Sequence, residues 1–471
     1  MHTIEQIFIN GEFVTPHGTE RFDLYNPATA QVIGQVRLAD EVDAARAVAA
    51  AKAAFPAWSQ TTKQERIAAL KRMHAAVAAR HDELLEAVIE EYGAPASRSA
   101  WMASYPAEVI AQAIEALEAF EFVTHAGAAT VQMTPLGVAG LITPWNSDAG
   151  FICGKLAAAL AAGCTAVIKP SEMSALQTQI VTEALRDAAL PPGVFNIVTG
   201  RGETVGETIS RHPDVAKISF TGSTNTGKAI LRNAAESFKR VTLELGGKSP
   251  TILLDDVDLA QAIPLVIQAG FMNSGQACVA GTRILVPQSR KTEMEAALAQ
   301  AVAAVKSGDP RDSATEIGPM VSEKQWLRVQ GYIRKGIEEG ARLLAGGEGR
   351  PDGTRDGWFV RPTLFADVNN QMTVARDEIF GPVLCVIPYQ DEAEAIAIAN
   401  DTEYGLSAMV LGGDADRARR VAQQIVSGRV LVNTLAHEPK APFGGFKHSG
   451  VGREMGEWGI RAFMEPRSVL G

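Results

Sequence analysis

The segment VAGLITPWN, residues 138–146, joins a short apolar run to a polar turn. Val138 to Ile142 is too short for a helix and is typical of a buried strand. Similar apolar runs follow, and stretches with helical character separate them. Short continuous apolar strands that alternate with helices indicate a parallel sheet covered on both faces. The predicted strands are 138–142, 166–169, 194–198, 216–220 and 240–243, and the predicted helices between them are 151–162, 175–189, 203–211 and 224–235.

A second alternation of the same kind follows residue 247 and predicts a second α/β domain. Before the first alternation, residues 5–36 indicate short strands and turns, and three helices follow them. The fold class is therefore α/β, with a doubly wound first sheet. The second set of strands is 251–254, 283–286, 383–387, 408–411 and 430–432, its helices are 258–272, 289–305, 322–338, 391–400 and 414–426, and the N-terminal helices are 40–55, 62–92 and 106–122.

The composition excludes several classes of protein. The chain has 471 residues, a net charge of -10 and no long basic run, which argues against a nucleic-acid partner. Its four cysteines form no CxxC pair and do not cluster with histidines, so we expect a reducing compartment and no metal site. There is no signal-peptide pattern, and the most apolar stretch, 156–168, is shorter than the roughly 20 residues that span a bilayer. We therefore expect a cytoplasmic protein with no membrane partner.

Polar or glycine-rich clusters stand where four of the predicted strands end. Each cluster alone is typical of a turn. The carboxyl ends of parallel strands share one edge of the sheet, however, and ligands bind at that edge. We therefore expect one site built from all four clusters. They are TPWN (143–146), KPSE (169–172), FTGS (220–223) and ELGGK (244–248).

Cys278 ends the segment NSGQAC, residues 273–278, between a helix-like apolar run and a strand-like run. A cysteine at such a junction can be presented at an open site, where its thiolate acts as a nucleophile. A lone cysteine is more often a half-buried structural residue. The residues around Cys278 leave both interpretations open.

The clusters and three further motifs together resemble the NAD(P)-dependent aldehyde dehydrogenase superfamily, in an order and spacing that match over essentially the whole chain. The further motifs are GQAC (275–278), EIFGP (378–382) and PFGGFK (442–447). The resemblance implies an oxidoreductase that uses NAD, with NADP as an alternative, and forms a homodimer or homotetramer. It also implies three structural parts. These are a Rossmann-type NAD-binding domain (1–121 and 137–246), an α/β catalytic domain (247–448), and bridging or oligomerisation segments (122–136 and 449–471).

The resemblance assigns the chemistry to three residues. Cys278 would add to an aldehyde carbonyl, and the side-chain amide of Asn146 with the backbone N–H of Cys278 would hold the oxyanion. After hydride transfer to the nicotinamide, Glu244 would activate the water that hydrolyses the thioester. Glu454 resembles a carboxylate that some members use as a proton relay. Taken without the resemblance, Asn146 could be a turn residue and Glu244 a solvated charge.

The expected cofactor contacts come from the same resemblance. Ser223 starts a predicted helix, and the free N–H groups of that helix would bind the pyrophosphate. Lys169 and Glu172 would meet the adenosine ribose, and an acidic group there favours NAD over NADP. Glu378 would hold the nicotinamide ribose, with Phe380 near the ring. The remaining expected contacts are Trp145, Ser171, Gly202, Phe220, Gly222 and Leu245.

The chain differs from many relatives in the residues that are expected to line the substrate pocket. Asn146 is followed by Ser147 in place of an aromatic residue, and Phe151 and Gly154 stand where relatives line the substrate tunnel. A hydroxyl and a small residue predict a roomier, more polar entrance and therefore a bulky or polar aldehyde. The neighbours of the nucleophile, Ala277 and Val279, offer no charge to a substrate carboxylate. His437 and Lys440 could offer one, although a surface position is expected for both.

Three other functions remain open at this stage. In CoA-acylating members CoA replaces water as the acyl acceptor, but Glu244 favours hydrolysis. A non-catalytic binding or structural protein of this fold need not keep Cys278, Asn146 and Glu244 together. A cysteine esterase would use the same thiolate, but these motifs contain no histidine partner. The leading prediction is an NAD-dependent aldehyde dehydrogenase that makes a carboxylic acid.

Overall fold

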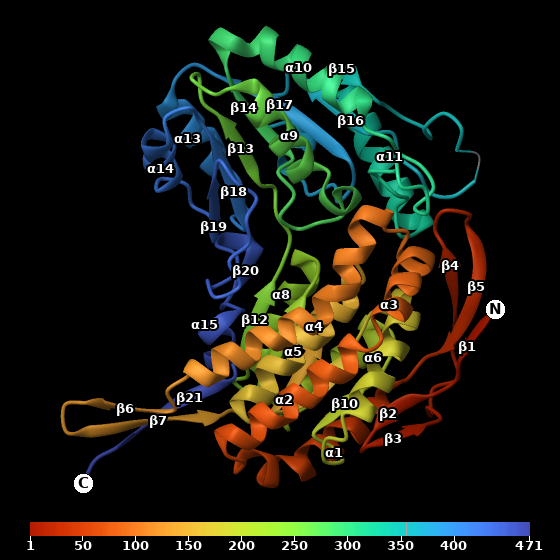
Figure 1. Cartoon of the computed structure of the whole chain (residues 1–471), viewed down its shortest axis with the longest axis vertical. Coiled ribbons are helices and arrows are strands. Elements are labelled where there is room, and N and C mark those ends of the chain that lie inside the picture. The colour runs from red at the N-terminus through yellow and green to blue at the C-terminus, as the bar shows by residue number, and fades with distance from the viewer. Residues whose placement is uncertain (355) are drawn as a thin grey trace.

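The computed structural model describes residues 1–354 and 356–471 and forms two α/β lobes (Figure 1). The first lobe contains the N-terminal half of the chain, and the second contains the strands from β13 (Pro250–Leu253) to β19 (Arg429–Val432). A small sheet projects from the first lobe near the C-terminus. Within the described residues, no helix is both long and apolar enough to cross a membrane.

The first lobe is built on an eight-stranded sheet with the order β20-β12-β11-β8-β9-β10-β2-β3. From β8 the chain adds β9 and β10 on one side and then β11 and β12 on the other, all parallel. The strand order reverses beside β8, so the sheet is doubly wound as predicted, and a crevice opens at the carboxyl ends of the strands there. The bounds are β2 Ile7–Ile9, β3 Glu12–Val14, β8 Val138–Ile142, β9 Thr165–Lys169, β10 Phe195–Ile197, β11 Val215–Thr221, β12 Arg240–Glu244 and β20 Gly450–Val451.

Helices cover both faces of this sheet. Leu141 of β8 packs into a cluster with α2, α4 and α5, whereas its neighbour Ile142 packs into a cluster with α1 and α7. Alternate residues of one strand therefore enter two separate cores, which is why the strand is apolar throughout. The helices of this lobe are α1 Glu41–Ser59, α2 Lys63–Ala78, α3 His81–Ala87, η1 Val88–Tyr92, α4 Ala96–Ala119, α5 Asp148–Ala162, η2 Glu172–Ser174, α6 Ala175–Asp187, η3 Gly202–Gly206, α7 Glu207–Arg211 and α8 Thr224–Ala235.

Two predictions for the N-terminal helices are wrong. The single helix expected over 62–92 is divided into α2, α3 and η1, and a left-handed Gly93 (φ 78°) closes the last of them. The helix expected over 106–122 begins at Ala96 and ends at Ala119. Pro106 lies inside α4, not at its start. Proline is common in the first turn of a helix, and that preference misplaced the boundary.

The second lobe contains a seven-stranded sheet with the order β15-β16-β17-β14-β13-β18-β19. All its neighbours are parallel except the edge pair of β15 and β16, two short strands that the sequence did not predict. They lie on either side of the loop 346–358, in which Arg355 is outside the described residues. The elements not yet named are η4 Met272–Gly275, α9 Leu259–Gly270, β14 Arg283–Pro287, η5 Gln288–Arg290, α10 Lys291–Ala304, α11 Glu323–Glu338, β15 Arg342–Ala345, β16 Thr363–Ala366, α12 Thr373–Arg376, β17 Val383–Tyr389, α13 Glu392–Asn400, β18 Ser407–Leu411 and α14 Ala415–Ala422.

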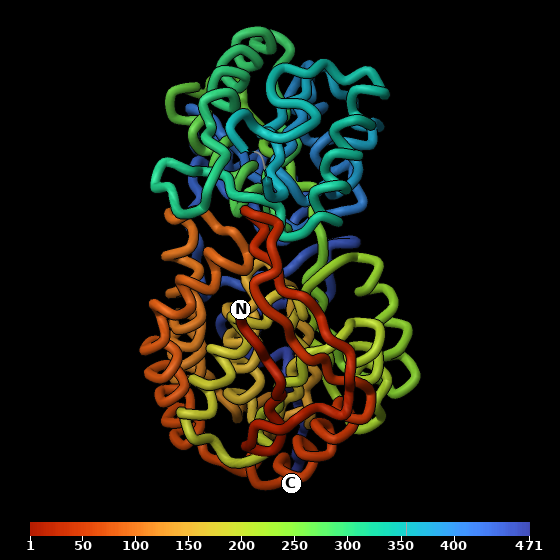
Figure 2. The backbone as a smooth tube through the Cα atoms, turned by 90° about the vertical axis from the view of Figure 1, so that its right-hand side faces the viewer, coloured from red at the N-terminus to blue at the C-terminus, as the bar shows by residue number. Residues whose placement is uncertain are grey.

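Two three-stranded sheets complete the chain. The N-terminal sheet, β1 (His2–Ile4), β5 (Gln31–Arg37) and β4 (Arg21–Asn26), runs along the first lobe up to the second (Figure 2). The other sheet pairs β6 (Val123–Ala126) and β7 (Ala129–Pro135) with β21 (Met464–Val469) and forms the projecting arm of Figure 1. The short elements η6 (Lys447–Ser449) and α15 (Gly456–Arg461) precede β21. The predicted bridging segments thus meet in one sheet, although their role in assembly stays a prediction.

Candidate active site

A cavity of about 950 Å³ lies at the carboxyl ends of β8, β9, β11 and β12. All four strand-end clusters line it, so they meet at one edge as expected. The second lobe contributes Cys278 and the segment from Glu378 to Phe380. The lining also includes Trp145, Asn146, Phe151, Glu172, Gly222, Ser223, Glu244 and Leu245.

The loop that carries Cys278 has an unusual backbone. Asn273, Ser274 and Gly275 are all left-handed, with φ of 56°, 59° and 74°. A β-carbon at Gly275 would lie 2.2 Å from the carbonyl carbon of Gly381. Only glycine fits there, because both the positive φ and the close approach exclude a side chain. The nucleophile loop is therefore packed directly on the segment that contains Glu378 and Phe380.

Gln276 fixes this loop from the inside. Its side chain is fully buried, and its amide nitrogen donates to the Tyr92 hydroxyl at 3.2 Å and to the Pro319 carbonyl at 3.4 Å. Its amide oxygen accepts from the backbone N–H of Val321 at 3.0 Å. A buried amide with this many partners holds one rotamer. Gln276 was not predicted as a functional residue, since nothing in the local sequence shows that its partners come from segments so far apart.

The Cys278 thiol is half-buried. Burial raises its pKa to about 12, and the nearby carboxyls of Glu378 and Glu244 act in the same direction. At neutral pH the resting side chain is therefore a thiol, and a base must take its proton before it becomes a nucleophile.

Asn146 lies against the same loop. Its amide nitrogen donates to the Gln276 carbonyl at 3.0 Å, and its backbone carbonyl accepts from the side chain of Asn273, also at 3.0 Å. An asparagine amide has two N–H groups, and the second one has no partner among the residues that the structure describes. Asn146 can therefore hold the loop with one N–H and donate to a developing oxyanion with the other.

Glu244 ends β12 and is buried, with only 3% of its surface exposed. Neither of its carboxylate oxygens has a hydrogen-bond partner within the described part of the chain. Burial raises the pKa of Glu244 well above its ordinary value, and the charge of Glu454 adds to the rise. A β-carbon at Gly444 would come within 2.8 Å of one carboxylate oxygen. The side chain thus occupies a close-fitting, unpaired position, which is typical of a general base.

Glu454 joins a buried polar network beside Glu244. Its carboxylate pairs with Lys155 at 2.5 Å and accepts from the Ser219 hydroxyl at 2.9 Å. The Lys155 amine also donates to Ser219, at 3.0 Å. The Glu454 side chain is 20% exposed while Lys155 is 2% exposed, so the network leads from the interior toward solvent.

The groups predicted for the adenosine end lie together. Lys169 pairs with Glu172 at 3.2 Å, and Arg201, which the sequence analysis missed, approaches the other Glu172 oxygen at 3.4 Å. Burial would raise the pKa of Glu172, but the two cations outweigh it and hold the pKa below its ordinary value. Ser171 caps the short helix that carries Glu172. The charged carboxylate is thus fixed at the end of β9.

The groups predicted for the pyrophosphate surround the start of α8. Ser223 is its N-cap and accepts from the N–H of Thr226 at 3.2 Å. Gly222 is needed because a β-carbon there would strike the Phe220 ring at 2.4 Å, and Leu245 fills the space beside Gly227 of α8. Gly202 is exposed at the start of η3, and, like Phe220, Lys169 and Ser171, it is not among the residues that line the cavity.

The groups predicted for the nicotinamide end come from both lobes. Glu378 accepts from the backbone N–H of Gly247 at 3.0 Å, and burial raises its pKa to about 7. A β-carbon at Gly246 would lie 2.4 Å from the Glu378 carboxylate, so the two lobes touch there through glycine. Phe380 has a φ of 61° and meets Trp145 edge to face, with ring centroids 5.5 Å apart.

The residues predicted for the substrate pocket divide into two groups. Phe151 lines the cavity, Ser147 stands at the start of α5, and Ala277 and Val279 are half-buried beside Cys278. Gly154 packs toward α4, since a β-carbon there would contact Val109 at 3.6 Å. That distance is an ordinary van der Waals contact, so helix packing does not require glycine here, and the role of Gly154 at the substrate tunnel stays a prediction. Lys440 pairs with Glu115 at 3.5 Å on the surface.

Tyr105 of α4 was not predicted but lies close to these groups. A β-carbon at Gly150 would strike its ring at 2.5 Å, so α4 and α5 approach closely beside Ser147. Burial raises the pKa of Tyr105 to about 12, and the charges of Glu454 and Cys278 contribute to the rise. Trp101 stacks on it with a centroid distance of 4.3 Å.

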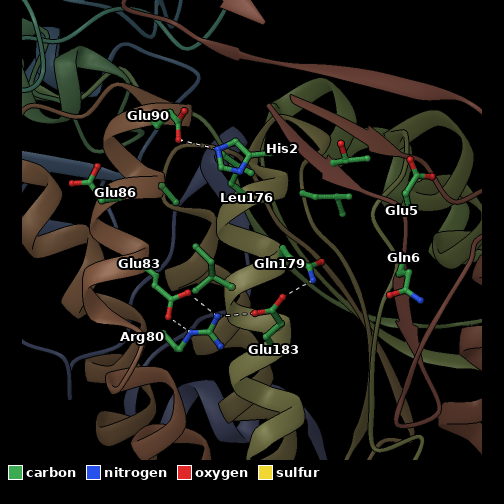
Figure 3. Close-up of a pocket in the computed structure, with 14 residues that line it drawn as sticks. His2, Glu5, Gln6, Arg80, Glu83, Glu86, Glu90, Leu176, Gln179 and Glu183 are labelled. Carbon is green, nitrogen blue, oxygen red and sulfur yellow. Dashed lines mark hydrogen bonds and ion pairs between the residues drawn. The ribbon is translucent and has the colours of Figure 1, made fainter. Parts of the chain in front are cut away.

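A second cavity, of about 540 Å³, lies between β1, α3 and α6 (Figure 3). Its charged groups have ion-pair partners, some within the cavity and some, for Glu5 and Glu86, outside it. Arg80 pairs with Glu83 and Glu183, and His2 meets Glu90. It contains no nucleophile. Among the described residues, no group of three His, Cys, Asp or Glu side chains could hold a metal ion.

Comparison with known proteins agrees with this geometry. The model of the aldehyde dehydrogenase family matches residues 13–469. A 3-succinoylsemialdehyde-pyridine dehydrogenase from a Pseudomonas species is 44% identical, over 100% of this chain and 99% of its own length. The crystal structure of a mutant aldehyde dehydrogenase C from Pseudomonas syringae, in complex with NAD+ and octanal, matches with a TM-score of 0.98 and 44% identity, over 100% of this chain and 97% of that one.

A further solved structure, the aldehyde dehydrogenase of Mycobacterium tuberculosis in complex with NAD+, gives a TM-score of 0.96 at 42% identity, over 99% of this chain and 98% of that one. Such identity over whole chains, together with the family match, excludes the interpretation that this chain is an unrelated protein of similar fold. The chain belongs to the aldehyde dehydrogenase family, and its class is that of the NAD(P)-dependent aldehyde dehydrogenases.

Proposed function

We propose that this protein oxidises an aldehyde to a carboxylic acid, with Cys278 as nucleophile, Asn146 as oxyanion donor and Glu244 as base. The observation that carries the proposal is that all three line one cavity while both Glu244 oxygens lack a partner in the described chain. A thiol, an amide donor and an unpaired buried carboxyl are the groups that this reaction requires.

In the first half of the reaction the Cys278 thiol loses its proton to a base, and the sulfur bonds to the aldehyde carbon. The carbonyl oxygen becomes negative, and it would accept hydrogen bonds from the free N–H of the Asn146 amide and from the backbone N–H of Cys278. NAD, when bound, supplies the acceptor for the hydride that leaves this carbon. The carbon is then a thioester of Cys278.

In the second half Glu244 takes a proton from water, and the oxygen of that water adds to the thioester carbon. The sulfur leaves as a thiolate, regains a proton and frees the carboxylic acid. The proton held by Glu244 must then reach solvent. The network of Glu454, Lys155 and Ser219 lies beside it and leads outward, so we assign that network to proton release.

The residues of the first lobe fit NAD. The N-terminus of α8, capped by Ser223, offers N–H groups and a helix dipole to a pyrophosphate. The Glu172 carboxylate, kept charged by Lys169 and Arg201, would accept from ribose hydroxyls and repel a 2′-phosphate. Relatives solved with NAD+ support this assignment. The second lobe would add Glu378 at the other ribose.

A bulky or polar aldehyde remains our proposal for the substrate class, and it rests on Ser147, Phe151 and Gly154. Support comes from relatives, one named for a succinoylsemialdehyde-pyridine and one solved with octanal. Both of these aldehydes are larger than acetaldehyde.

The test is formation of reduced nicotinamide from a panel of aldehydes with NAD or NADP, with and without CoA. We expect NADH without CoA, and none from Cys278→Ala. A strict need for CoA would move the assignment to the acylating subtype. NAD binding without turnover of any aldehyde would favour a non-catalytic protein.

We also propose a homodimer or homotetramer in a reducing cytoplasm, with the domain bounds expected from the sequence. The arm of β6, β7 and β21 supports assembly, because Val123 and Val469 are each about half exposed on it. The four cysteines are all free, which fits a reducing compartment. Size-exclusion chromatography with light scattering, repeated after deletion of residues 466–471, would test the role of the arm.

A further inference from the structure

Arg201 lines the cavity at the strand ends, beside Glu172. It directly precedes η3 in the loop after β10, and Glu172 follows β9, the strand that pairs with β10. The Nη1 of Arg201 lies 3.4 Å from one Glu172 oxygen, and the Lys169 amine lies 3.2 Å from the other. The guanidinium therefore contacts the carboxylate that is proposed to bind the adenosine ribose.

The N-terminal part of the chain holds the Arg201 side chain from its other side. The Nε and Nη2 of Arg201 both donate to one oxygen of Glu20, at 3.0 and 2.8 Å. The centre of the guanidinium lies 4.9 Å from the centroid of the Phe22 ring, and Phe22 also lines the cavity. An ion pair and a cation–π contact thus fix the position of the guanidinium.

The backbone fixes Arg201 and Glu20 relative to each other. The N–H of Leu38 donates to the Glu20 carbonyl, and the N–H of the next residue, Ala39, donates to the Thr199 carbonyl, both at 2.8 Å. One short segment is therefore bonded to both loops that carry the ion pair. A ligand that enters the cavity meets a guanidinium whose position is already set, which lowers the cost of binding.

The Arg201 guanidinium has N–H groups to spare. Of its five N–H groups, three have acceptors within residues 1–354 and 356–471, two at Glu20 and one at Glu172. The contact with Glu172 is longer than the roughly 2.7–2.9 Å of a bond between charged groups. Each terminal nitrogen therefore keeps one N–H for a ligand. The side chain is 31% exposed, so a ligand in the cavity can reach them.

We propose that Arg201 binds the 2′-phosphate of NADP, so that two residues, Glu172 and Arg201, set the choice of coenzyme. The proposal rests on the proposed place of the adenosine ribose at Glu172 and adds an anion site to it. With NAD, a ribose hydroxyl donates to Glu172. With NADP, Glu172 repels the phosphate, but the two terminal N–H groups of Arg201 donate to its oxygens. The enzyme should therefore prefer NAD and still use NADP.

The first test measures binding without catalysis. Isothermal titration calorimetry compares adenosine 2′,5′-bisphosphate with 5′-AMP, which lacks the 2′-phosphate. In Arg201→Leu we expect the bisphosphate to weaken about tenfold relative to 5′-AMP, the size of a lost hydrogen bond to a charged group. Arg201→Lys keeps the charge without the fork and should weaken it about threefold.

The matched control for this test is Arg211→Leu, which removes an exposed arginine that pairs with Glu207 on α7. It should keep the wild-type ratio of the two affinities. Native circular dichroism establishes that each variant is folded. An unchanged ratio in either folded variant of Arg201 overturns the proposal, as does a wild-type protein that binds 5′-AMP and not the bisphosphate.

The second test asks whether both residues set the coenzyme. Glu172→Gln alone should move kcat/KM about tenfold from NAD toward NADP. In Glu172→Gln/Arg201→Leu that gain should be cancelled, and the ratio should return to within about twofold of the wild type. A double variant that keeps the full shift would show that Glu172 acts alone, and would overturn the proposal. Bisphosphate binding that depends on Arg201, in a protein that oxidises no aldehyde, would leave the anion site standing while the proposed function fails.

Discussion

The two cavities of this molecule differ in how their charges are satisfied. In the cavity between β1, α3 and α6, the guanidinium of Arg80 and the ring of His2 have carboxylate partners (Figure 3). In the cavity at the strand ends, Glu244 has no partner in the described chain although it is deeply buried. An unpaired buried titratable group, and not the number of charged groups, therefore marks the place of chemistry.

The largest expected effect is loss of the thiol. Cys278→Ala should lower kcat/KM by about 10⁴-fold or more, because the nucleophile forms the bond that the later steps depend on. Steady-state formation of NADH measures it. Cys164→Ala, at a fully buried thiol outside the cavity, is the matched control and should keep most activity if it folds. Full activity in Cys278→Ala would rule out the proposed mechanism.

Glu244→Gln should slow turnover by about 10³-fold, within the range for loss of a general base. A first burst of NADH should remain, since the thioester still forms. The pKa of Glu244 is raised, so the active, deprotonated form grows as pH rises through that pKa. The wild-type rate of hydrolysis should therefore rise with pH, and the variant should lose that dependence.

The same raised pKa gives a check on folding. The folded protein holds a proton on Glu244 that an unfolded chain releases near pH 4.5, so Glu244 weakens the fold as pH rises above that value. Glu244→Gln should raise Tm more at pH 8 than at pH 5. An equal change at both values would mean that burial leaves the pKa of Glu244 unshifted.

Asn146→Ala should lower kcat by about 10²-fold, the size expected for one oxyanion donor. Part of that loss would come from the loop, because the amide also holds the Gln276 carbonyl. Asn146→Asp removes the donor with little change in shape and separates the two contributions. If the Asp variant were as active as the wild type, the oxyanion role would be excluded.

Glu172→Gln should shift coenzyme preference by about tenfold in kcat/KM, from NAD toward NADP, because a negative charge near the 2′ position is removed. The ratio for the two coenzymes measures it. Ser171→Ala, at the cap beside it, should shift the ratio far less. No shift in Glu172→Gln would place the adenosine ribose elsewhere.

The smallest effect is expected from a substitution in the second cavity, the one between β1, α3 and α6. Glu183→Gln removes one partner of Arg80, whose side chain is 20% exposed, and should cost at most about 1 kcal/mol of unfolding free energy. Activity should change by less than about twofold. Urea unfolding and the NADH assay measure both. A large loss of activity would show that paired charge can mark a working site, and would break the comparison.

Much of this site could be predicted from the sequence because most of its functional residues come soon after the ends of strands. Each of Asn146, Glu172, Ser223 and Glu244 stands within four residues of the end of an apolar run, and parallel strands bring such positions to one edge. The fold class, the family and the NAD cofactor are confirmed by relatives solved with NAD+. The roles of the individual residues stay predictions.

The other features of the site could not be predicted, because they depend on contacts between distant segments that no local sequence pattern indicates. Gln276 is satisfied by Tyr92, Pro319 and Val321, which lie far from it in the chain. Gly154 was assigned to the substrate tunnel because its position along α5 resembles that of relatives; it faces Val109 of α4, which the sequence could not show, and its role at the tunnel stays a prediction. Strands β15 and β16 are short and one lies at an antiparallel edge, so neither gives a strong periodic signal.

The contact between Gly275 and Gly381 makes the thiol and the Glu378 carboxylate parts of one rigid body, whereas Glu244 belongs to the other lobe. Asn146 also belongs to the first lobe, and its amide donates to the Gln276 carbonyl beside the thiol. The oxyanion donor and the base thus come from one lobe and the nucleophile from the other, so both halves of the reaction depend on how the two lobes meet.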